Sequence, residues 1–325
     1  MKKRLWLLPI FLIILVLAAC GGQKTEGQSD KKAESQKHAE QSKQEFPVTV
    51  TDANGKKLTI KEKPKRIVSL IPSNTETAFA LGLGKKIVGV SDYDNYPKAA
   101  ASKEKVGGKD INIEKVVSLK PDLVLATASN AHNSSAGLKQ LRQAGIEVLV
   151  VNDAASFADV YKSIHLIAKA TGTGKKAKEI IDGMKEKVAE IKVKADKIPK
   201  QDRVKVWIEV SAPPNIFTAG SGTFMDEMLD IINAKNIAAE KKGWVKYSGE
   251  SVVKANPDVI VLTYGYYVKG AVKQVYNRSG WSGVSAVKNK RVYNVESDLV
   301  SRSGPRLAEG LEKMAEAVYP DVFKK

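Results

Sequence analysis

One motif occurs twice in this chain and constrains its fold more than any other feature of the sequence. The fourteen residues 114–127 match residues 250–263 at six positions, among them the glutamate that opens each copy and a central Pro-Asp pair. Each copy predicts a one-turn helix, a break at Pro-Asp and a short buried strand. Two halves that repeat such a unit predict two similar α/β lobes.

In both halves, apolar runs typical of buried strands alternate with helical patterns, which favours mainly parallel sheets and an α/β fold class. In the first half, a hairpin is expected at 48–60, strands at 66–70, 87–90, 123–126 and 147–151, and helices at 74–83, 113–119 and 136–144. In the second half, strands are expected at 204–210, 259–262 and 291–295, and helices at 224–232, 248–255 and 307–318.

The stretch between the two halves contains no convincing strand. A helix is expected at 158–170, and Gly172-Thr173-Gly174 ends it. Apolar residues then recur at helical spacing over 175–197, which predicts a helix about 33 Å long. A helix of that length can join two lobes. We therefore expect an N-terminal lobe at 47–172, one long rigid connecting helix at 173–198, a C-terminal lobe at 199–325, and a ligand cleft between the lobes.

The first 46 residues differ in composition from the rest. Three basic residues precede fifteen apolar residues at 5–19, fewer than the ~20 that a spanning helix needs, so residues 1–19 are expected to be a secretory signal. Leu17-Ala18-Ala19-Cys20 resembles the lipobox of bacterial lipoproteins, which implies cleavage before Cys20 and a lipid on its thiol. The alternative is a plain signal peptide with an incidental cysteine.

Residues 20–46 are expected to be the lipidated cysteine and a disordered tether. Within positions 21–46, the only apolar residues are Ala33, Ala39 and Phe46, too few to bury a core. This organisation predicts a protein anchored by lipid to the outer face of the cell membrane.

The formal net charge is +17, to which the signal contributes three positive charges. Basic charge raises the possibility of nucleic-acid binding, but a protein outside the cytoplasm meets no nucleic acid there. An anionic envelope surface, an acidic ligand or solvation alone could explain the charge. The single cysteine and three histidines argue against a disulfide and against a metal site.

No pattern in the sequence supports an enzyme. A Gly-x-Ser-x-Gly elbow is absent, and Gly172-Thr-Gly-Lys-Lys176 is too short for a phosphate-binding loop. His132 and His165 have no neighbouring acids that would indicate a catalytic triad.

Four segments together resemble the substrate-binding proteins of ABC importers that carry cobalamin, haem and ferric siderophores. They are Arg66–Glu76, Val88–Pro97, the two Pro-Asp repeats, and Arg302–Arg306 with the helix after it. The resemblance covers about residues 66–320. It implies two lobes joined by one rigid helix, a small-molecule ligand, an ABC permease with its ATPase as partners, and a monomer that binds no nucleic acid.

In that family, one surface glutamate on each lobe docks onto arginines of the permease. The matching residues are Glu114 and Glu250, which open the two repeats. Alternatively, each glutamate only complements a helix dipole, a contribution of ~0.3–1 kcal/mol.

The resemblance also implies a ligand surface on loops that follow strands. Flat aromatic rings suit a macrocycle, and arginine suits its acidic groups. The candidates are Tyr93, Tyr96, Phe217, Trp244, Tyr247, Tyr264, Tyr266 and Arg302. Alternatively, the tyrosines at 264–267 are core or strand-edge residues, and Arg306 is more simply explained as a helix start.

Tyr93 and Trp244 match the cobalamin-binding pattern, whereas Gly107-Gly108-Lys109 and Thr127 stand where those relatives often carry aromatic residues. A cobamide is therefore the first expectation for the ligand, with a ferric siderophore or haem as alternatives. A surface adhesin or signalling lipoprotein is the alternative of another class.

Overall fold

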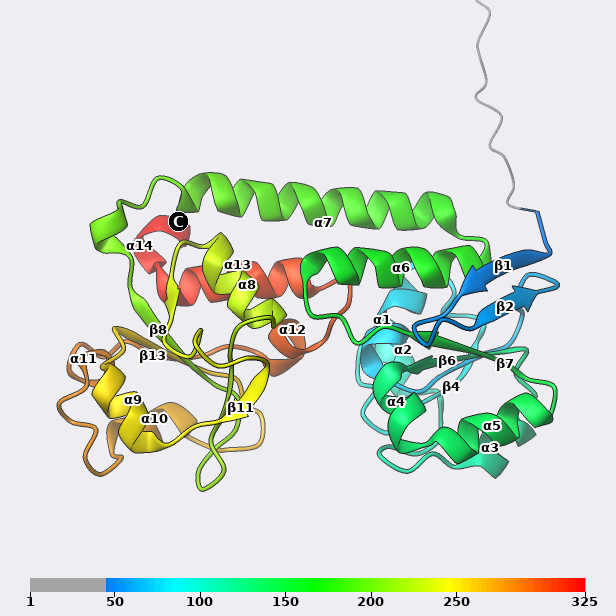
Figure 1. Ribbon diagram of the computed structural model, residues 1–325, viewed down its shortest axis with the longest axis horizontal. Coiled ribbons are helices and arrows are strands. Elements are labelled where there is room, and N and C mark those ends of the chain that lie inside the picture. The colour runs from blue at the N-terminus through cyan, green and yellow to red at the C-terminus, as the bar shows by residue number, and fades with distance from the viewer. Residues whose placement is uncertain (1–44, 325) are drawn as a thin grey trace, which may run out of the picture. The chain divides into compact units, whose positions relative to one another are not determined.

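The computed structural model describes residues 45–324, and two parallel sheets organise this part of the chain (Figure 1). The first has the order β5-β4-β3-β6-β7, and the second has the order β10-β8-β12-β13. The expected fold class, two α/β lobes with mainly parallel sheets, is confirmed. The strands of the first sheet are β3 (Ile67–Ser69), β4 (Ile87–Val90), β5 (Glu104–Lys105), β6 (Leu123–Thr127) and β7 (Glu147–Val151). Those of the second are β8 (Lys205–Glu209), β10 (Lys235–Asn236), β12 (Val259–Leu262) and β13 (Val292–Asn294).

Two antiparallel pairs accompany these sheets. The expected hairpin consists of β1 (Val48–Thr51) and β2 (Lys57–Ile60), with Val48 opposite Ile60. A second pair, β9 (Phe217–Ala219) and β11 (Trp244–Lys246), was not expected from the sequence. Strands of three residues are too short to show the alternation by which a strand is recognised.

Helices cover the sheets in both lobes. In the N-terminal lobe they are α1 (Pro72–Ala80), α2 (Lys98–Ala101), α3 (Ile113–Ser118), α4 (Ala128–Asn133), α5 (Ser135–Gln143) and α6 (Phe157–Thr171). In the C-terminal lobe they are α8 (Phe224–Ile231), α9 (Gly249–Ala255), α10 (Ala271–Tyr276), α11 (Ser285–Lys288), α12 (Ser297–Ser301), α13 (Leu307–Val318) and α14 (Pro320–Phe323), and a 3-10 turn spans Lys200–Asp202. Within residues 45–324, no helix is both long enough and apolar enough to span a bilayer.

Helix α7 (Gly174–Ala195) connects the lobes and runs beside α6 and α13 (Figure 1). Gly172 ends α6 in a left-handed conformation, φ +67°, which glycine adopts without a steric penalty. The buried face of α7 includes Ile181, Met184 and Ile191. These residues belong to one cluster of buried side chains that extends from the first sheet, through α6 and α7, into α8 and α13. The two lobes therefore share a hydrophobic core.

The repeated Pro-Asp pair has the same structural role in both lobes. The Asp122 carboxylate accepts a hydrogen bond of 2.7 Å from the Lys65 backbone N–H, and its own N–H donates to the Arg66 carbonyl at 2.9 Å. The Asp258 carboxylate accepts at 2.7 Å from the Lys205 N–H, and its N–H donates to the Lys205 carbonyl at 2.8 Å. Each aspartate thus ties the start of the repeat's strand to the start of the neighbouring strand.

The folded part begins earlier than the composition of the tether indicates. Phe46 is half-buried and packs against the shared core, and a Cβ atom added to Gly172 would lie 3.0 Å from its ring. Phe46 therefore contacts the folded body, because the adjacent glycine leaves room for the ring. The expected signal, Cys20 and almost all of the tether lie outside the described residues.

Candidate functional site

Exposed aromatic side chains are concentrated in a few short segments of the described chain. Eight large hydrophobic side chains are exposed, and six of them are aromatic. These six are Tyr93, Tyr96, Phe217, Trp244, Tyr266 and Tyr267. They lie on the loop after β4, on the β9-β11 pair and on the loop after β12. Aromatic rings left in water forgo hydrophobic stabilisation, and groups of them mark binding surfaces.

In the N-terminal lobe, the loop of residues 91–97 carries Tyr93 and Tyr96. The Tyr93 ring lies over Gly108, where an added Cβ atom would come within 2.9 Å of the ring. The Tyr96 ring faces the Arg306 guanidinium, whose Cζ is 3.8 Å from the ring centroid. This distance is typical of a cation–π contact. The glycine at 108, a departure from the cobalamin-binding pattern, thus makes room for Tyr93.

The same loop encloses a buried carboxyl group. Asp94 is buried, and its carboxylate accepts a hydrogen bond of 2.6 Å from the Ser91 hydroxyl. The Lys105 ammonium donates to the backbone carbonyls of Ser91 and Asp94 at 3.1 and 2.8 Å. Burial raises the pKa of Asp94, and the hydrogen bond from Ser91 and the nearby Lys105 charge offset only part of that effect. Polar contacts on the buried side of the loop therefore stabilise its conformation.

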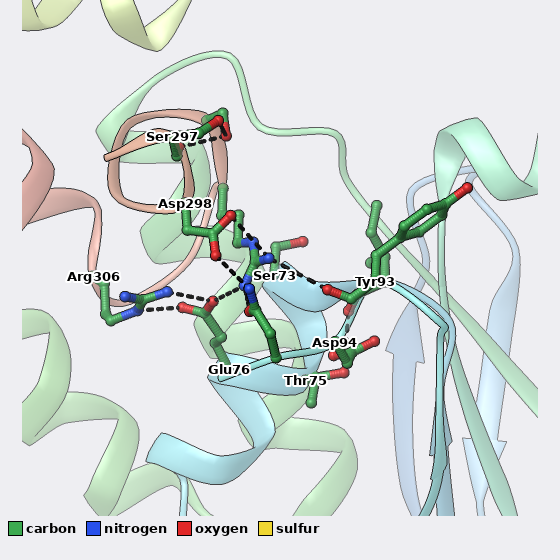
Figure 2. A network of polar contacts seen from close by, with 12 residues as sticks. Ser73, Thr75, Glu76, Tyr93, Asp94, Ser297, Asp298 and Arg306 are labelled. Carbon is green, nitrogen blue, oxygen red and sulfur yellow. Dashed lines mark hydrogen bonds and ion pairs between the residues drawn. The ribbon is translucent and has the colours of Figure 1, made fainter. Parts of the chain in front are cut away.

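A buried ion-pair network joins this region to the C-terminal lobe (Figure 2). Glu76 on α1 binds Arg302 and Arg306, which stand on either side of the short segment between α12 and α13. The Glu76 side chain is 2% exposed, and the two arginine side chains are 13% and 12% exposed. Hydrogen bonding to Glu76 raises the pKa of Arg306. One buried carboxylate is therefore shared by two arginine side chains.

The structure places Arg302 in this network rather than among the exposed side chains. Its guanidinium pairs with the carboxylates of Glu76 and Asp298 at 2.8 and 3.0 Å. Arg306 lies at the N-terminus of α13 and pairs with Glu76 at 2.8 Å.

Tyr264 differs from the exposed aromatic candidates, because it is only 1% exposed. Its hydroxyl donates a 2.6 Å hydrogen bond to Glu209, which is fully buried at the end of β8. Arg278 binds both oxygens of this carboxylate at 3.0 and 2.8 Å, and the Trp207 indole N–H donates at 3.0 Å. Burial, with the adjacent Glu209, raises the pKa of Tyr264 far above its usual value. Tyr264 is thus part of a buried polar cluster rather than of an exposed surface.

The other aromatic candidates of the C-terminal lobe are accessible to different extents. Trp244 is 49% exposed and contacts Phe224 edge-on, with 5.8 Å between ring centroids. Tyr266 packs edge-on against Tyr267 at 4.8 Å. Tyr247 is half-buried beside Trp207, and its hydroxyl donates to Glu240 at 3.2 Å. Phe217 and Trp244 lie on paired strands, so one small sheet carries both rings.

The two candidate docking residues have matching environments. Glu114 and Glu250 are exposed in the first turns of α3 and α9. Asn112 caps α3 by accepting from the Lys115 N–H at 2.9 Å, and Ser248 caps α9 by accepting from the Ser251 N–H at 3.1 Å. Figure 1 shows α3 and α9 on the side of the sheets turned away from α7.

A hollow of about 490 Å³ lies elsewhere, at the C-terminal end of α7. Its lining includes Lys194, Pro199 and Tyr319, and no candidate ligand residue contributes to it. In the part of the chain that the structure describes, no group of three or more His, Cys, Asp or Glu side chains is placed to hold a metal ion.

Glu76 and Glu209 are the residues near the site whose roles sequence reasoning missed. Glu209 follows three apolar residues at the end of β8, and a charge at such a buried position requires a partner. Arg302 and Arg306, on either side of Gly304-Pro305, likewise indicate an acidic partner. These signals indicate that a partner exists, but local spacing does not show which residue it is.

Comparison with known proteins places the chain in a family. A family model described as periplasmic binding protein matches residues 67–299, and the chain belongs to this family. It is 50% identical, over the full length of both chains, to an uncharacterised ABC transporter substrate-binding lipoprotein of Bacillus subtilis strain 168, YvrC. The chain is therefore the substrate-binding component of an ABC transporter, which implies a permease, an ATPase and a small-molecule ligand as partners.

Two further relatives differ in what their names say they bind. A cobalamin-binding protein of Halobacterium salinarum is 31% identical over 84% of this chain and 74% of its own length. A crystal structure of a possible iron-binding, periplasmic solute-binding protein from Staphylococcus epidermidis is 39% identical, with a TM-score of 0.71 over 79% of this chain and all of that one. The relatives are solute-binding transport proteins rather than enzymes.

Proposed function

We propose that this protein captures a cobamide or a similar iron-chelate ligand outside the cytoplasm and delivers it to an ABC import permease. The observation that carries the proposal is the set of exposed aromatic rings on both lobes, with Tyr93 on one lobe and Trp244 on the other. A large planar ligand offers flat faces to such rings. The cobalamin-binding relative from Halobacterium salinarum supports a cobamide as the first choice.

A ferric siderophore or haem is the alternative ligand, and the iron-binding relative favours it. Haem iron requires an axial ligand from the protein, and the accessible hydroxyls of Tyr93, Tyr96 and Tyr266 are suitable in type. We leave Tyr264 and Arg302 out of the proposed ligand surface, because both are engaged in buried polar contacts. The surface then consists of Tyr93, Tyr96, Phe217, Trp244, Tyr247, Tyr266 and Tyr267.

Tryptophan fluorescence of the purified protein tests the ligand. Trp207 and Trp281 are buried, whereas Trp244 is half exposed on the proposed surface. Titration with cyanocobalamin, haemin and a ferric hydroxamate should give saturable quenching by one of them. The Trp244→Phe variant should lose most of that quenching, with calorimetry as the independent measure of affinity. If none of the three ligands binds, the proposed ligand class is wrong.

We also propose that Cys20 carries the lipid anchor, in line with the lipoprotein relative. Two or more acyl chains would hold the protein firmly at the membrane surface. The Cys20→Ala variant should accumulate as an unlipidated precursor when cells are labelled with a fatty acid. Normal cleavage and labelling of that variant would contradict the proposal.

We further propose that Glu114 and Glu250 form the docking surface for the permease. Their support is the equivalent placement of the two residues at exposed, capped helix starts. Two carboxylates that pair with arginines across an interface would set the orientation of docking as well as its strength.

A further inference from the structure

The loop that carries Tyr93 and Tyr96 is held by side chains of the other lobe. We propose that Glu76 is a positioning residue for ligand binding, because it anchors Arg302 and Arg306, and these arginines fix the loop of residues 91–97. The proposal rests on the proposed function, since it takes Tyr93 and Tyr96 as part of the ligand surface. Glu76 itself is nearly inaccessible and cannot touch a ligand there.

Glu76 anchors both arginines through hydrogen bonds to its two carboxylate oxygens. Glu76 Oε1 accepts from Arg302 Nη1 and from Arg306 Nη2, both at 2.8 Å. Glu76 Oε2 accepts from Arg306 Nε at 2.8 Å. Charged hydrogen bonds of this length, away from water, are strong and directional. One carboxylate of the N-terminal lobe therefore sets the positions of two guanidinium groups from the C-terminal lobe (Figure 2).

Both arginines in turn contact the loop of residues 91–97. Arg302 Nη1 donates to Asn95 Oδ1 at 2.7 Å, and its Nη2 reaches the Tyr93 carbonyl at 3.4 Å. The Arg306 guanidinium lies 3.8 Å from the centroid of the Tyr96 ring. Three of the loop's seven residues thus contact one of the two arginines.

Asp298 on α12 closes the network. It accepts from Asn95 Nδ2 at 2.8 Å and pairs with Arg302 Nη2 at 3.0 Å. Asn95 therefore receives a hydrogen bond from Arg302 and donates one to Asp298. Both of these partners lie on the C-terminal lobe, so the loop is bound to that lobe through its central side chain.

This arrangement matters because apolar burial does little to hold these side chains. Tyr93 is 61% exposed, Tyr96 is 45% exposed, and Asn95 is exposed as well. An exposed loop that orders only on binding reduces affinity by the entropy it loses, and preorganisation avoids that loss. We therefore expect Glu76 to raise ligand affinity at a distance, through the order that it imposes on Tyr93 and Tyr96.

Hydrogen exchange in the ligand-free protein tests the positioning directly. In Glu76→Gln, the amides of residues 92–96 should exchange roughly tenfold faster, the expected effect of losing a charged hydrogen bond. Amides of β12, in the other sheet, should be unaffected. The matched control is Glu312→Gln, which breaks a 2.7 Å ion pair with Lys187 but has no contact with the loop. Unchanged exchange at 92–96, or an equal increase in both lobes, would overturn the proposal.

A double-mutant cycle tests the link to the ligand. With cyanocobalamin and haemin as probes, Glu76→Gln should weaken binding by roughly tenfold in the wild-type and Trp244→Ala backgrounds. In a background that carries both Tyr93→Ala and Tyr96→Ala, the same substitution should change affinity by less than about twofold, because Glu76 is expected to act on binding by positioning these two rings. Equal effects in all three backgrounds would show that Glu76 does not act through the loop.

A variant that fails to fold and a wrong ligand class can each be distinguished from a wrong role for Glu76. If Glu76→Gln does not fold, Arg302→Gln replaces it, because that variant keeps the Arg306 pair while removing the contacts with Asn95 and Tyr93, and the same results are expected. If neither probe binds the wild-type protein, the proposed ligand class is wrong, and exchange in the ligand-free protein still decides the role of Glu76.

Discussion

Glu76 and Glu209 are carboxylates with almost no access to water, and arginines neutralise both. Removing one partner of such a pair costs about 3–5 kcal/mol, because the other charge then remains buried without compensation. Each cluster also lies beside a loop with exposed tyrosines, residues 91–97 for Glu76 and residues 263–267 for Glu209. Buried charge in this protein is thus placed next to the proposed ligand surface.

Tyr264→Phe separates the structural role of this tyrosine from a role in binding. The substitution removes a hydrogen bond to a buried carboxylate, so the free energy of unfolding should fall by about 1–3 kcal/mol. Ligand affinity should stay within about twofold, because the hydroxyl does not reach the surface. Denaturant unfolding and a binding titration of the same preparation check both values. If the variant is as stable as the wild-type protein but binds the ligand more weakly, Tyr264 belongs to the ligand surface.

Asp94 should give a pH-dependent signature. Its pKa is raised in the folded state, so between pH ~4 and that raised value the folded protein binds more protons than the unfolded chain. The contribution of Asp94 to stability therefore decreases as pH rises through this window and is constant above it. Asp94→Asn should remove that decrease. Unfolding free energies of both proteins from pH 4 to 8 provide the test, and parallel curves would contradict the assignment.

Residue roles were predictable from the sequence only in part. Tyr93, Tyr96, Phe217, Trp244 and Tyr266 were found through the family resemblance and because flat rings suit a macrocycle, and the structure exposes all of them. Tyr264 is adjacent to the same exposed tyrosines in sequence, yet it is buried by a pairing with Glu209, 55 residues away. Partners brought together by tertiary structure leave no local pattern, so Glu76 and Glu209 could not be assigned in advance.

At the scale of elements, the repeat was the most reliable guide. Helices α3 and α9 and strands β6 and β12 occupy equivalent places in the two lobes, and the boundaries expected from the sequence differ from those observed by at most one residue. Short elements such as β9, β11 and α12 were missed because they are held by long-range contacts rather than by their own periodicity.

The two repeated aspartates should contribute similarly to stability. Asp122→Ala and Asp258→Ala each remove a carboxylate that binds a backbone N–H at the start of a neighbouring strand. Each should lower the free energy of unfolding by about 1 kcal/mol or more. Asp110→Ala, at an exposed position of the N-terminal lobe, is the matched control and should have little effect. Urea unfolding measures all three, and an effect no larger than the control would show that the pair is not structural.

At the scale of the whole folded body, the lobes are joined by more than one connection. Helix α7 and the shared core link them, and Glu227 on α8 accepts a 2.7 Å hydrogen bond from the Phe157 N–H at the start of α6. The Glu76 network adds a second polar contact between the lobes. A closely packed shared core resists continuous deformation.

Lobe closure on ligand binding should therefore be small. The radius of gyration from small-angle X-ray scattering should change by less than about 1 Å, because backbone displacements in preorganised complexes are themselves about 1 Å or less. Scattering curves of the ligand-free and saturated protein make the comparison. Saturation is checked in the same samples by tryptophan quenching. A change of several ångströms would show that the shared core does not restrain the lobes.

The division between a ligand surface and a docking surface is tested most directly by binding and uptake measured on the same variants. The double variant Glu114→Ala, Glu250→Ala should abolish uptake of the ligand by cells while leaving affinity within about twofold, because we propose that both side chains act only at the permease. Trp244→Ala should weaken binding by about 1 kcal/mol or more, through lost stacking, and should reduce uptake only in proportion. Loss of ligand binding in the double glutamate variant, with docking to the permease preserved, would contradict the account.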